Sequence, residues 1–129
     1  MKKNIGIAYG GYSSEYEISI KSGEFIFEIL DKNPDWNVYK VLITKEKASV
    51  LLLDDKIEEI NIKDFSFNYH NNRVKFDAIY NIIHGSPGET GEFSSLLEKI
   101  GIPQTSCSSK ICKLTFDKHE YIKFIIYVF

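Results

Sequence analysis

The chain has 129 residues, of which 43% are hydrophobic and 26% are charged. This length fits one domain, and this composition is typical of a folded, soluble protein and excludes a disordered one. Sixteen Lys and Arg residues against eighteen Asp and Glu residues give a formal charge of −2. No basic block is present that could neutralise a row of phosphates, so the sequence argues against nucleic acid as a partner.

Signals for export or membrane insertion are not apparent in the sequence. Apolar stretches such as Val50–Leu53 fall far short of the ~20 residues that span a bilayer, and Met1–Lys3 leads directly into a strand-like run. Cys107 and Cys112 make no disulfide framework, and His119 is the only candidate third ligand for a metal. We therefore expect a reducing, cytoplasmic location and a structural role for both cysteines.

The first third of the chain predicts a strand, a helix and a second strand. Residues 4–9 form an apolar run that ends at Gly10 and Gly11, which is typical of a buried strand followed by a tight turn. Ser14 and Glu17 stand at capping-box spacing and predict the helix start. Residues 37–44 predict the second strand. It should run parallel to the first, because a helix connects the two.

The predicted helix has one mostly apolar face. Lys21, Glu24 and Glu28 fall outside this face, as in an amphipathic helix that packs on a sheet. Asn33 and Pro34 end the helix. The residues of the face recur at intervals of three and four, and they are Ile18, Ser22, Phe25, Ile26, Ile29 and Leu30.

The middle of the chain predicts a hairpin inserted before a central strand. Residues 50–53 read as a short strand, and residues 65–76 read as a β-hairpin with its turn at positions 70–72. Residues 76–83 are the most apolar strand candidate and lead directly into the glycine-rich loop 84–91. The insertion is too short to form a second domain.

Two helical patterns follow this loop. Phe93, Leu96 and Ile100 keep helical spacing as far as Gly101, a typical residue after a helix C-terminus. A last helix is expected from Ile111 toward the end of the chain. The predicted fold is therefore α/β, with a Rossmann-like, mostly parallel sheet flanked by helices and a β-hairpin insertion.

Two loops follow the carboxyl ends of predicted parallel strands, where open α/β sheets bind ligands. Residues 10–15 could bind an anion on a helix N-terminus or form a plain tight turn. Glu15 could pair with a substrate ammonium or remain solvated. His84 could contact an anionic ligand, transfer a proton or only pack. The sequence contains no G-x-S-x-G elbow, dinucleotide fingerprint or Walker A loop.

Four motifs, taken in order, resemble the amino-terminal region of D-alanine:D-alanine ligases of the ATP-grasp superfamily. The family patterns are GGxSxExx[IV]S, HGxxGExG, G[IL]P and [MF][DN]K. Here the corresponding segments read GGYSSEYEIS (10–19), HGSPGETG (84–91), GIP (101–103) and FDK (116–118). The resemblance implies a Rossmann-like pre-ATP-grasp domain over residues 1–106. Residues 107–129 would be a helix that leads into an ATP-grasp domain missing from this chain.

The resemblance further implies a bacterial, ATP-dependent carbon-nitrogen ligase that joins two D-alanines for peptidoglycan synthesis. ATP, with Mg²⁺ or Mn²⁺, phosphorylates the first D-alanine carboxylate, and the amine of the second D-alanine attacks the acyl phosphate. By the same resemblance, Glu15 is catalytic and holds the first D-alanine ammonium, His84 lies beside its carboxylate, and Lys118 reaches ATP phosphate. The residues expected to shape the site are Gly10, Gly11, Ser14, Gly85 and Gly88.

The chain departs from the family in two respects. Residues 105–108 read TSCS where the family has TGSG, a change that does not touch the substrate residues. The parts that would carry most of the ATP site and all metal ligands are missing, so we expect the chain alone to be inactive. One alternative is a small-molecule-binding or homodimer-forming module, because the family's dimers are built largely through this region. Another is part of a ligase that joins D-alanine to D-serine or D-lactate.

Overall fold

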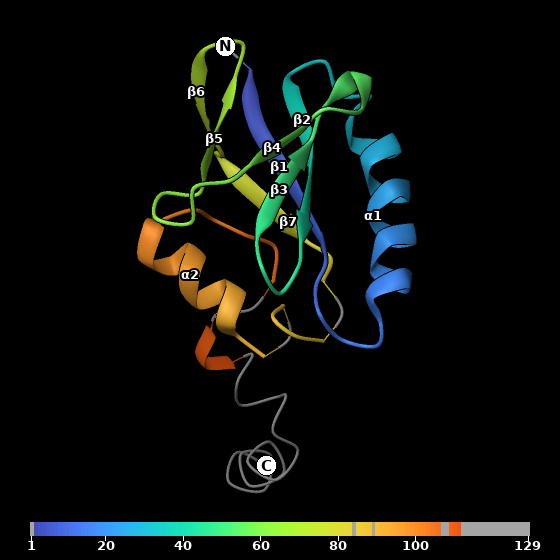
Figure 1. Ribbon diagram of the computed structural model, residues 1–129, viewed down its shortest axis with the longest axis vertical. Helices are drawn as coiled ribbons and strands as arrows, with labels where there is room; N and C mark the ends of the chain where they lie inside the picture. The colour runs from blue at the N-terminus through green and yellow to red at the C-terminus, as the bar shows by residue number, and fades with distance from the viewer. Residues whose placement is uncertain (1, 84, 89, 107–108, 112–129) are drawn as a thin grey trace, which may run out of the picture.

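The structure is a computed structural model that describes residues 2–83, 85–88, 90–106 and 109–111. Its main sheet has the strand order β4-β3-β2-β1-β7. Helices α1 (Tyr16–Leu30) and α2 (Glu92–Ile100) lie on opposite sides of this sheet (Figure 1). The strands are β1 (Lys3–Gly10), β2 (Trp36–Ile43), β3 (Ala48–Leu51), β4 (Ile57–Glu59) and β7 (Ala78–Asn81).

Strand pairing confirms the predicted α/β fold. β1 pairs in parallel with both β2 and β7, as a helical crossover between β1 and β2 requires. β3 and β4 extend this parallel centre as antiparallel strands, and a short 3-10 helix (Leu53–Asp55) connects them. The sequence did not predict β4. None of the helices in the described ranges is both long enough and apolar enough to cross a membrane.

The predicted hairpin is also confirmed. β5 (Ser66–Tyr69) and β6 (Asn72–Lys75) pair antiparallel around a turn in which His70 and Asn71 have φ values of 50° and 63°. Two successive positive φ angles match the twist of a tight hairpin. The hairpin forms its own two-stranded sheet and packs against the main sheet through its aromatic residues.

The hydrophobic core lies between the main sheet, the hairpin and α2. Phe65 is completely buried at its centre, with ring centroids 5.8 Å from Phe76 and 5.7 Å from Phe93. These contacts pack the start of α2 against Phe65, next to β5, and join both to the segment just before β7. The core residues are Ala8, Val41, Ile43, Ala48, Val50, Ile60, Phe65, Phe67, Phe76, Ile79, Ile83, Phe93 and Leu97.

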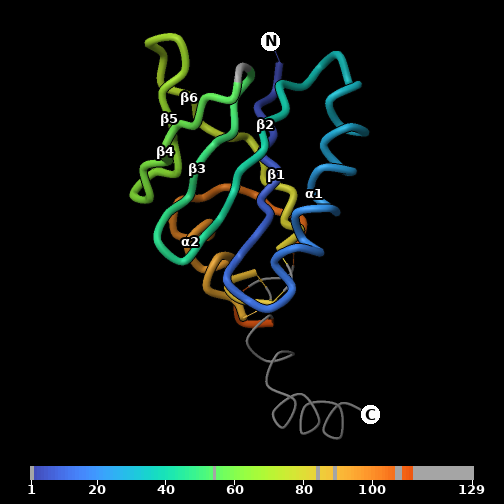
Figure 2. Tube along the Cα trace, turned by 45° about the vertical axis from the view of Figure 1, so that its right-hand side comes forward, coloured from blue at the N-terminus to red at the C-terminus, as the bar shows by residue number. Residues whose placement is uncertain are grey.

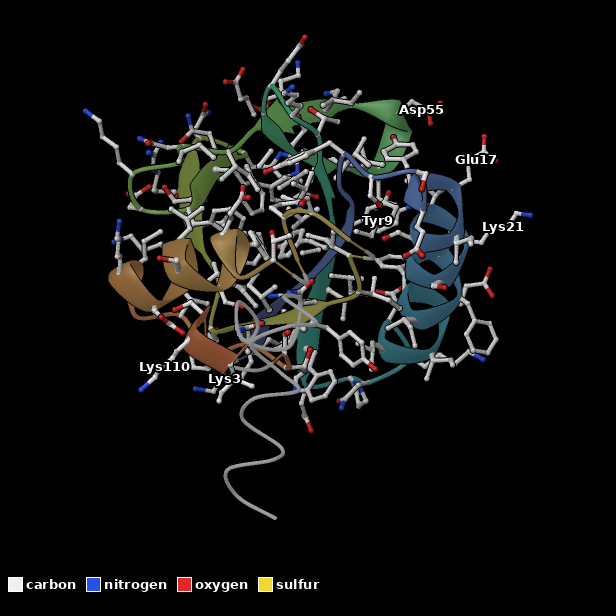
Figure 3. All side chains as sticks on the ribbon, turned by 90° about the horizontal axis from the view of Figure 1, so that it is seen from below. Lys3, Tyr9, Glu17, Lys21, Asp55 and Lys110 are labelled. Carbon is white, nitrogen blue, oxygen red and sulfur yellow. The ribbon has the colours of Figure 1, made fainter. Side chains whose placement is uncertain are left out.

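The face of α1 that packs on the sheet is not the apolar face that the sequence predicted. Ser19 and Gly23 are its buried residues, whereas Ile18, Phe25 and Ile29 are 57%, 63% and 49% exposed. The cause is Tyr9, which lies between the sheet and α1 (Figure 3). A Cβ atom on Gly23 would come within 2.6 Å of the Tyr9 ring. Only small residues let the helix approach this ring, so the bulky residues turn outward.

The start of α1 also differs from the prediction. Glu15, and not Ser14, is the N-cap residue, and no side chain caps the helix. The Ser13 hydroxyl instead accepts the Glu15 N–H at 3.1 Å and stabilises the turn before the helix. At the other end of the chain, residues 109–111 are helical. The rest of the predicted last helix and the two cysteines lie outside the described residues, and the boundary between residues 106 and 107 stays a prediction.

Candidate functional site

The two loops singled out in the sequence meet at one edge of the sheet. β1 and β7 are parallel neighbours, so their carboxyl ends reach the same end of the molecule (Figures 1 and 2). The Tyr12 N–H donates to the Ser86 carbonyl at 3.0 Å, which links the first loop directly to the second. The Gly11 N–H donates to the Ile43 carbonyl at 2.7 Å and ties the first loop to β2.

Glycine is required where the loops touch. Gly11 has a φ of +86°, and a Cβ there would stand 2.6 Å from Ile83 Cγ2 and 2.7 Å from the Ser86 carbonyl oxygen. Gly85 has a φ of +74°, and its Cβ would be 2.6 Å from the Ser13 hydroxyl oxygen. Side chains at these positions would separate the loops, and an L residue is strained at such φ angles. The loops therefore interlock through backbone.

Gly10 and Gly88 lie in the same pair of loops, at close contacts with backbone carbonyl groups. A Cβ on Gly10 would meet the Ile43 carbonyl oxygen at 2.8 Å, and one on Gly88 would meet the Ile83 carbonyl oxygen at 2.7 Å. The four glycines expected to shape the site thus all lie at close backbone contacts of the loop pair.

Glu15 stands on the rim of this junction. Its side chain is exposed, its N–H donates to Ser13, and its carbonyl accepts the Ser19 N–H at 3.1 Å. A carboxylate at a helix N-terminus is stabilised by the helix dipole. This geometry provides a negative charge on a fixed turn that is open to solvent.

Ser13 is a contact residue that the sequence analysis missed. Ser14, which was expected to shape the site, is exposed, whereas Ser13 lies between the turn of Glu15 and Gly85. The family pattern has its serine at position 13, and that signal could have identified the residue.

His84 and Lys118 lie outside the described residues, so their roles stay predictions. Ile83 and Gly85 flank position 84 and belong to the interlocked loops. Within the described ranges, no group of three or more His, Cys, Asp or Glu side chains is placed to hold a metal ion.

A second tie joins the first loop to α2. The Tyr12 hydroxyl donates to Glu92 Oε2 at 2.9 Å, and both residues line a cavity of about 280 Å³ together with Pro87 and the turn between β2 and β3. Burial and the hydrogen bond to Glu92 raise the pKa of Tyr12 to about 12. No local sequence pattern indicates this pair, because its members are 80 positions apart.

We expect the free energy of unfolding to fall as the pH rises above about 10. Burial raises the pKa values of Tyr9, Tyr12 and Tyr39 above their usual range, so the unfolded chain loses these protons first. A raised pKa contributes stability that is complete below the unfolded value and is lost as the pH rises through the folded value. Urea unfolding at about pH 8 and about pH 11 measures the fall. The Tyr12→Phe variant should show a smaller fall, and an equal fall would contradict a contribution from Tyr12.

Comparisons with known proteins identify the family to which the chain is similar. The family model described as D-ala D-ala ligase N-terminus matches residues 4–107. The chain is 45% identical over 122 residues to the D-alanine-D-alanine ligase of Christiangramia forsetii, covering 95% of this chain and 37% of the relative. It is 39% identical over 126 residues to that of Parabacteroides distasonis, covering 95% and 38%. The chain thus spans less than half the length of these relatives.

Solved structures show the same fold. The D-alanyl-alanine synthetase A of Vibrio cholerae matches with a TM-score of 0.82 and 30% identity, covering 95% of this chain and 36% of that chain. The VanG D-Ala:D-Ser ligase of Enterococcus faecalis has the same fold, with a TM-score of 0.77 at 23% identity, covering 93% and 40%. Because the family model covers both glycine loops and the elements that hold them, this chain belongs to the family of D-alanine-D-alanine ligase N-terminal regions.

Proposed function

We propose that this chain supplies the first D-alanine site of a D-alanine-D-alanine ligase. The observation that carries the proposal is the exposed Glu15 carboxylate on the helix turn that the interlocked glycine loops hold. Membership of the family and the resemblance at Glu15 support the same assignment.

Free D-alanine carries an ammonium and a carboxylate, and each needs a partner. In this proposal the Glu15 carboxylate accepts hydrogen bonds from the ammonium, which is a charge-assisted contact and therefore among the stronger kinds. His84, one position before Gly85, binds the substrate carboxylate. The glycines keep side chains out of the loop junction, so that Gly85 stays close to Ser13, in the turn that leads to Glu15.

Most of the remaining chemistry belongs, in this proposal, to the part of the relatives that the chain does not cover. Lys118 is proposed to contact ATP phosphate, and ATP with a divalent metal would supply the phosphoryl group that activates the substrate carboxylate. Such transfer depends on positioned metals and cations. Membership of the ligase family also supports our proposal of a bacterial cytoplasmic location and a role in peptidoglycan synthesis.

The test is an activity assay on a ligase-length fusion. Residues 1–107 of this chain, which contain the matched range 4–107, are joined to the remaining part of the Christiangramia forsetii ligase. We expect phosphate release that requires both ATP and D-alanine, with D-alanyl-D-alanine as the product, and none from the 129-residue chain alone. A folded fusion that binds ATP but releases no phosphate with D-alanine would contradict the proposal.

A second candidate role is homodimer formation through α1. Ile18, Phe25 and Ile29 form one exposed apolar stripe, because their spacings of seven and four residues place them on one side of a helix. Exposed Lys21 and Glu28 border it on the same flank. When two copies of α1 pack antiparallel about a two-fold axis near Phe25, Lys21 of each copy faces Glu28 of the other.

The position of α1 favours a second copy over the rest of a ligase-length chain. The last described residues, 109–111, lie on the α2 side of the sheet, and α1 lies on the other side (Figure 1). We propose that the stripe is covered by the same stripe of a second copy.

We expect Phe25→Glu to shift the 129-residue chain from dimer to monomer, because it places two carboxylates at the centre of the proposed contact. Sedimentation velocity over a range of concentrations measures the shift. Ile57→Glu is the matched control, since Ile57 is equally exposed, at 62%, but lies on edge strand β4. A dimer that survives Phe25→Glu and dissociates with Ile57→Glu would place the contact on the sheet edge instead.

A further inference from the structure

Ser19 is a buried hydroxyl that connects three parts of the candidate site. Its side chain is completely buried, and its oxygen accepts the Gly10 N–H at 2.9 Å. The same hydroxyl donates to the Ile82 carbonyl oxygen at 2.7 Å. One side chain on α1 thus joins the end of β1 to the exit of β7. Ile82, at this exit, is 63 positions from Ser19 along the chain.

Both hydrogen bonds leave the helix that carries the serine. A serine inside a helix commonly bonds to the backbone of its own preceding turn. Ser19 instead bonds to backbone groups of two strands, and in doing so it uses its donor and one acceptor site together. Buried backbone groups need such partners. An alanine at position 19 would remove the hydrogen bonds that the Gly10 N–H and the Ile82 carbonyl make to this hydroxyl.

Ser19 is one helical turn from Glu15. Its N–H donates to the Glu15 carbonyl at 3.1 Å, so the position of Ser19 determines that of the turn that bears the carboxylate. Ile82, at the other end of the bridge, is two positions before His84. The Ser19 hydroxyl therefore lies between the backbone that carries Glu15 and the backbone that leads to position 84.

We propose that Ser19 is a positioning residue for the first D-alanine. Its hydroxyl holds the Glu15 turn and the exit of β7 at the separation that lets one small amino acid meet both at once. The inference rests on the proposed function and adds to it a residue that does not touch the substrate. Small misplacements of binding groups reduce turnover strongly, so a single buried hydroxyl has a measurable effect.

The chain offers a matched control in Ser66. It is also completely buried, and its hydroxyl donates to Asp64 Oδ1 at 2.6 Å. Ser66 lies on β5 in the hairpin, away from both glycine loops. Removal of either hydroxyl costs stability, but only Ser19 joins the loops of the site.

The experiment measures Michaelis constants of the ligase-length fusion with Ser19→Ala, Ser19→Cys and Ser66→Ala. We expect both Ser19 variants to raise KM for the first D-alanine about tenfold or more, with KM for ATP unchanged within about twofold. Ser66→Ala should leave both constants near their wild-type values. Ser19→Cys keeps the shape of the side chain, with a somewhat larger sulfur atom that is a much weaker donor, and it leaves no cavity, so it remains informative where Ser19→Ala does not fold.

The outcomes separate this inference from the function on which it rests. An active wild-type fusion whose Ser19 variants keep the wild-type KM for D-alanine overturns the positioning role and leaves the ligase proposal standing. Equal rises of KM in Ser19→Ala and Ser66→Ala show a general loss of stability and also overturn it. A wild-type fusion without D-alanine-dependent activity overturns the proposed function itself, and the positioning role with it.

Discussion

Replacement of Glu15 by glutamine in the ligase-length fusion should lower kcat/KM for D-alanine by about a hundredfold. The glutamine keeps the size of the side chain but removes the negative charge that is proposed to bind the substrate ammonium. The Ser13 hydroxyl accepts the backbone N–H of residue 15 in both proteins, so the fold should not change. Initial rates at several D-alanine concentrations measure the effect.

Glu17→Gln is the control for this substitution. Glu17 lies in the same first turn of α1, is exposed, and points away from the body of the protein (Figure 3). Glu17→Gln removes one negative charge from the same helix end, so it shows how much of the kinetic loss comes from the change in net charge alone. Similar kinetic losses in the two variants would show that Glu15 has no specific contact with the substrate.

The second large effect is expected for Gly11→Ala, which should lower the free energy of unfolding by about 2–5 kcal/mol. The alanine would hold a φ of +86° and place its Cβ 2.6 Å from Ile83 and 2.7 Å from the Ser86 carbonyl oxygen. One of these contacts is with backbone, so the loops must separate to accept it. Urea unfolding of the chain measures the loss.

Gly101→Ala separates backbone strain from loop contact. Gly101 has a φ of +91°, and no atom of the described residues lies within 4 Å of the Cβ that it would carry. Its loss should therefore be only the strain of an L residue at positive φ, about 1–2 kcal/mol. If Gly11→Ala lost no more than this, the close contact between the loops would not matter for stability.

The strand arrangement and the glycine loops followed from local patterns. One glycine loop follows the apolar run at residues 4–9, and the other, at residues 84–91, follows the later apolar strand. If these two strands are parallel, both loops lie at the same edge of the sheet. Residues 70 and 71 and Gly101 adopt the positive φ angles that their turn and cap predict. These features depend on a few neighbouring residues, so a sequence alone can reveal them.

The orientation of α1 did not follow from periodicity. The apolar spacing of Ile18, Phe25 and Ile29 is real, but it marks the exposed stripe and not the buried face. Which face packs was decided by Tyr9, a bulky residue on another element that leaves room only for Ser19 and Gly23. A small residue pair at positions i and i+4 was the available signal, and it competes poorly with three large apolar side chains.

The connections that complete the site are long-range and have no local signal. Ser19 bonds to Ile82, and Tyr12 bonds to Glu92, across 63 and 80 positions. Each pair depends on how β1 and β7 are aligned, and one residue of register shift would separate its partners. Such contacts become visible only once the fold is known.

A crystal structure of the ligase-length fusion with D-alanine bound tests the proposed role of Glu15 most directly. We expect the D-alanine ammonium within hydrogen-bond distance of the Glu15 carboxylate, at the edge where the two glycine loops interlock. D-alanine bound elsewhere with Glu15 facing solvent would contradict it. The cavity of about 450 Å³ lined in part by Phe27, Trp36 and Tyr39 is one such place on this chain.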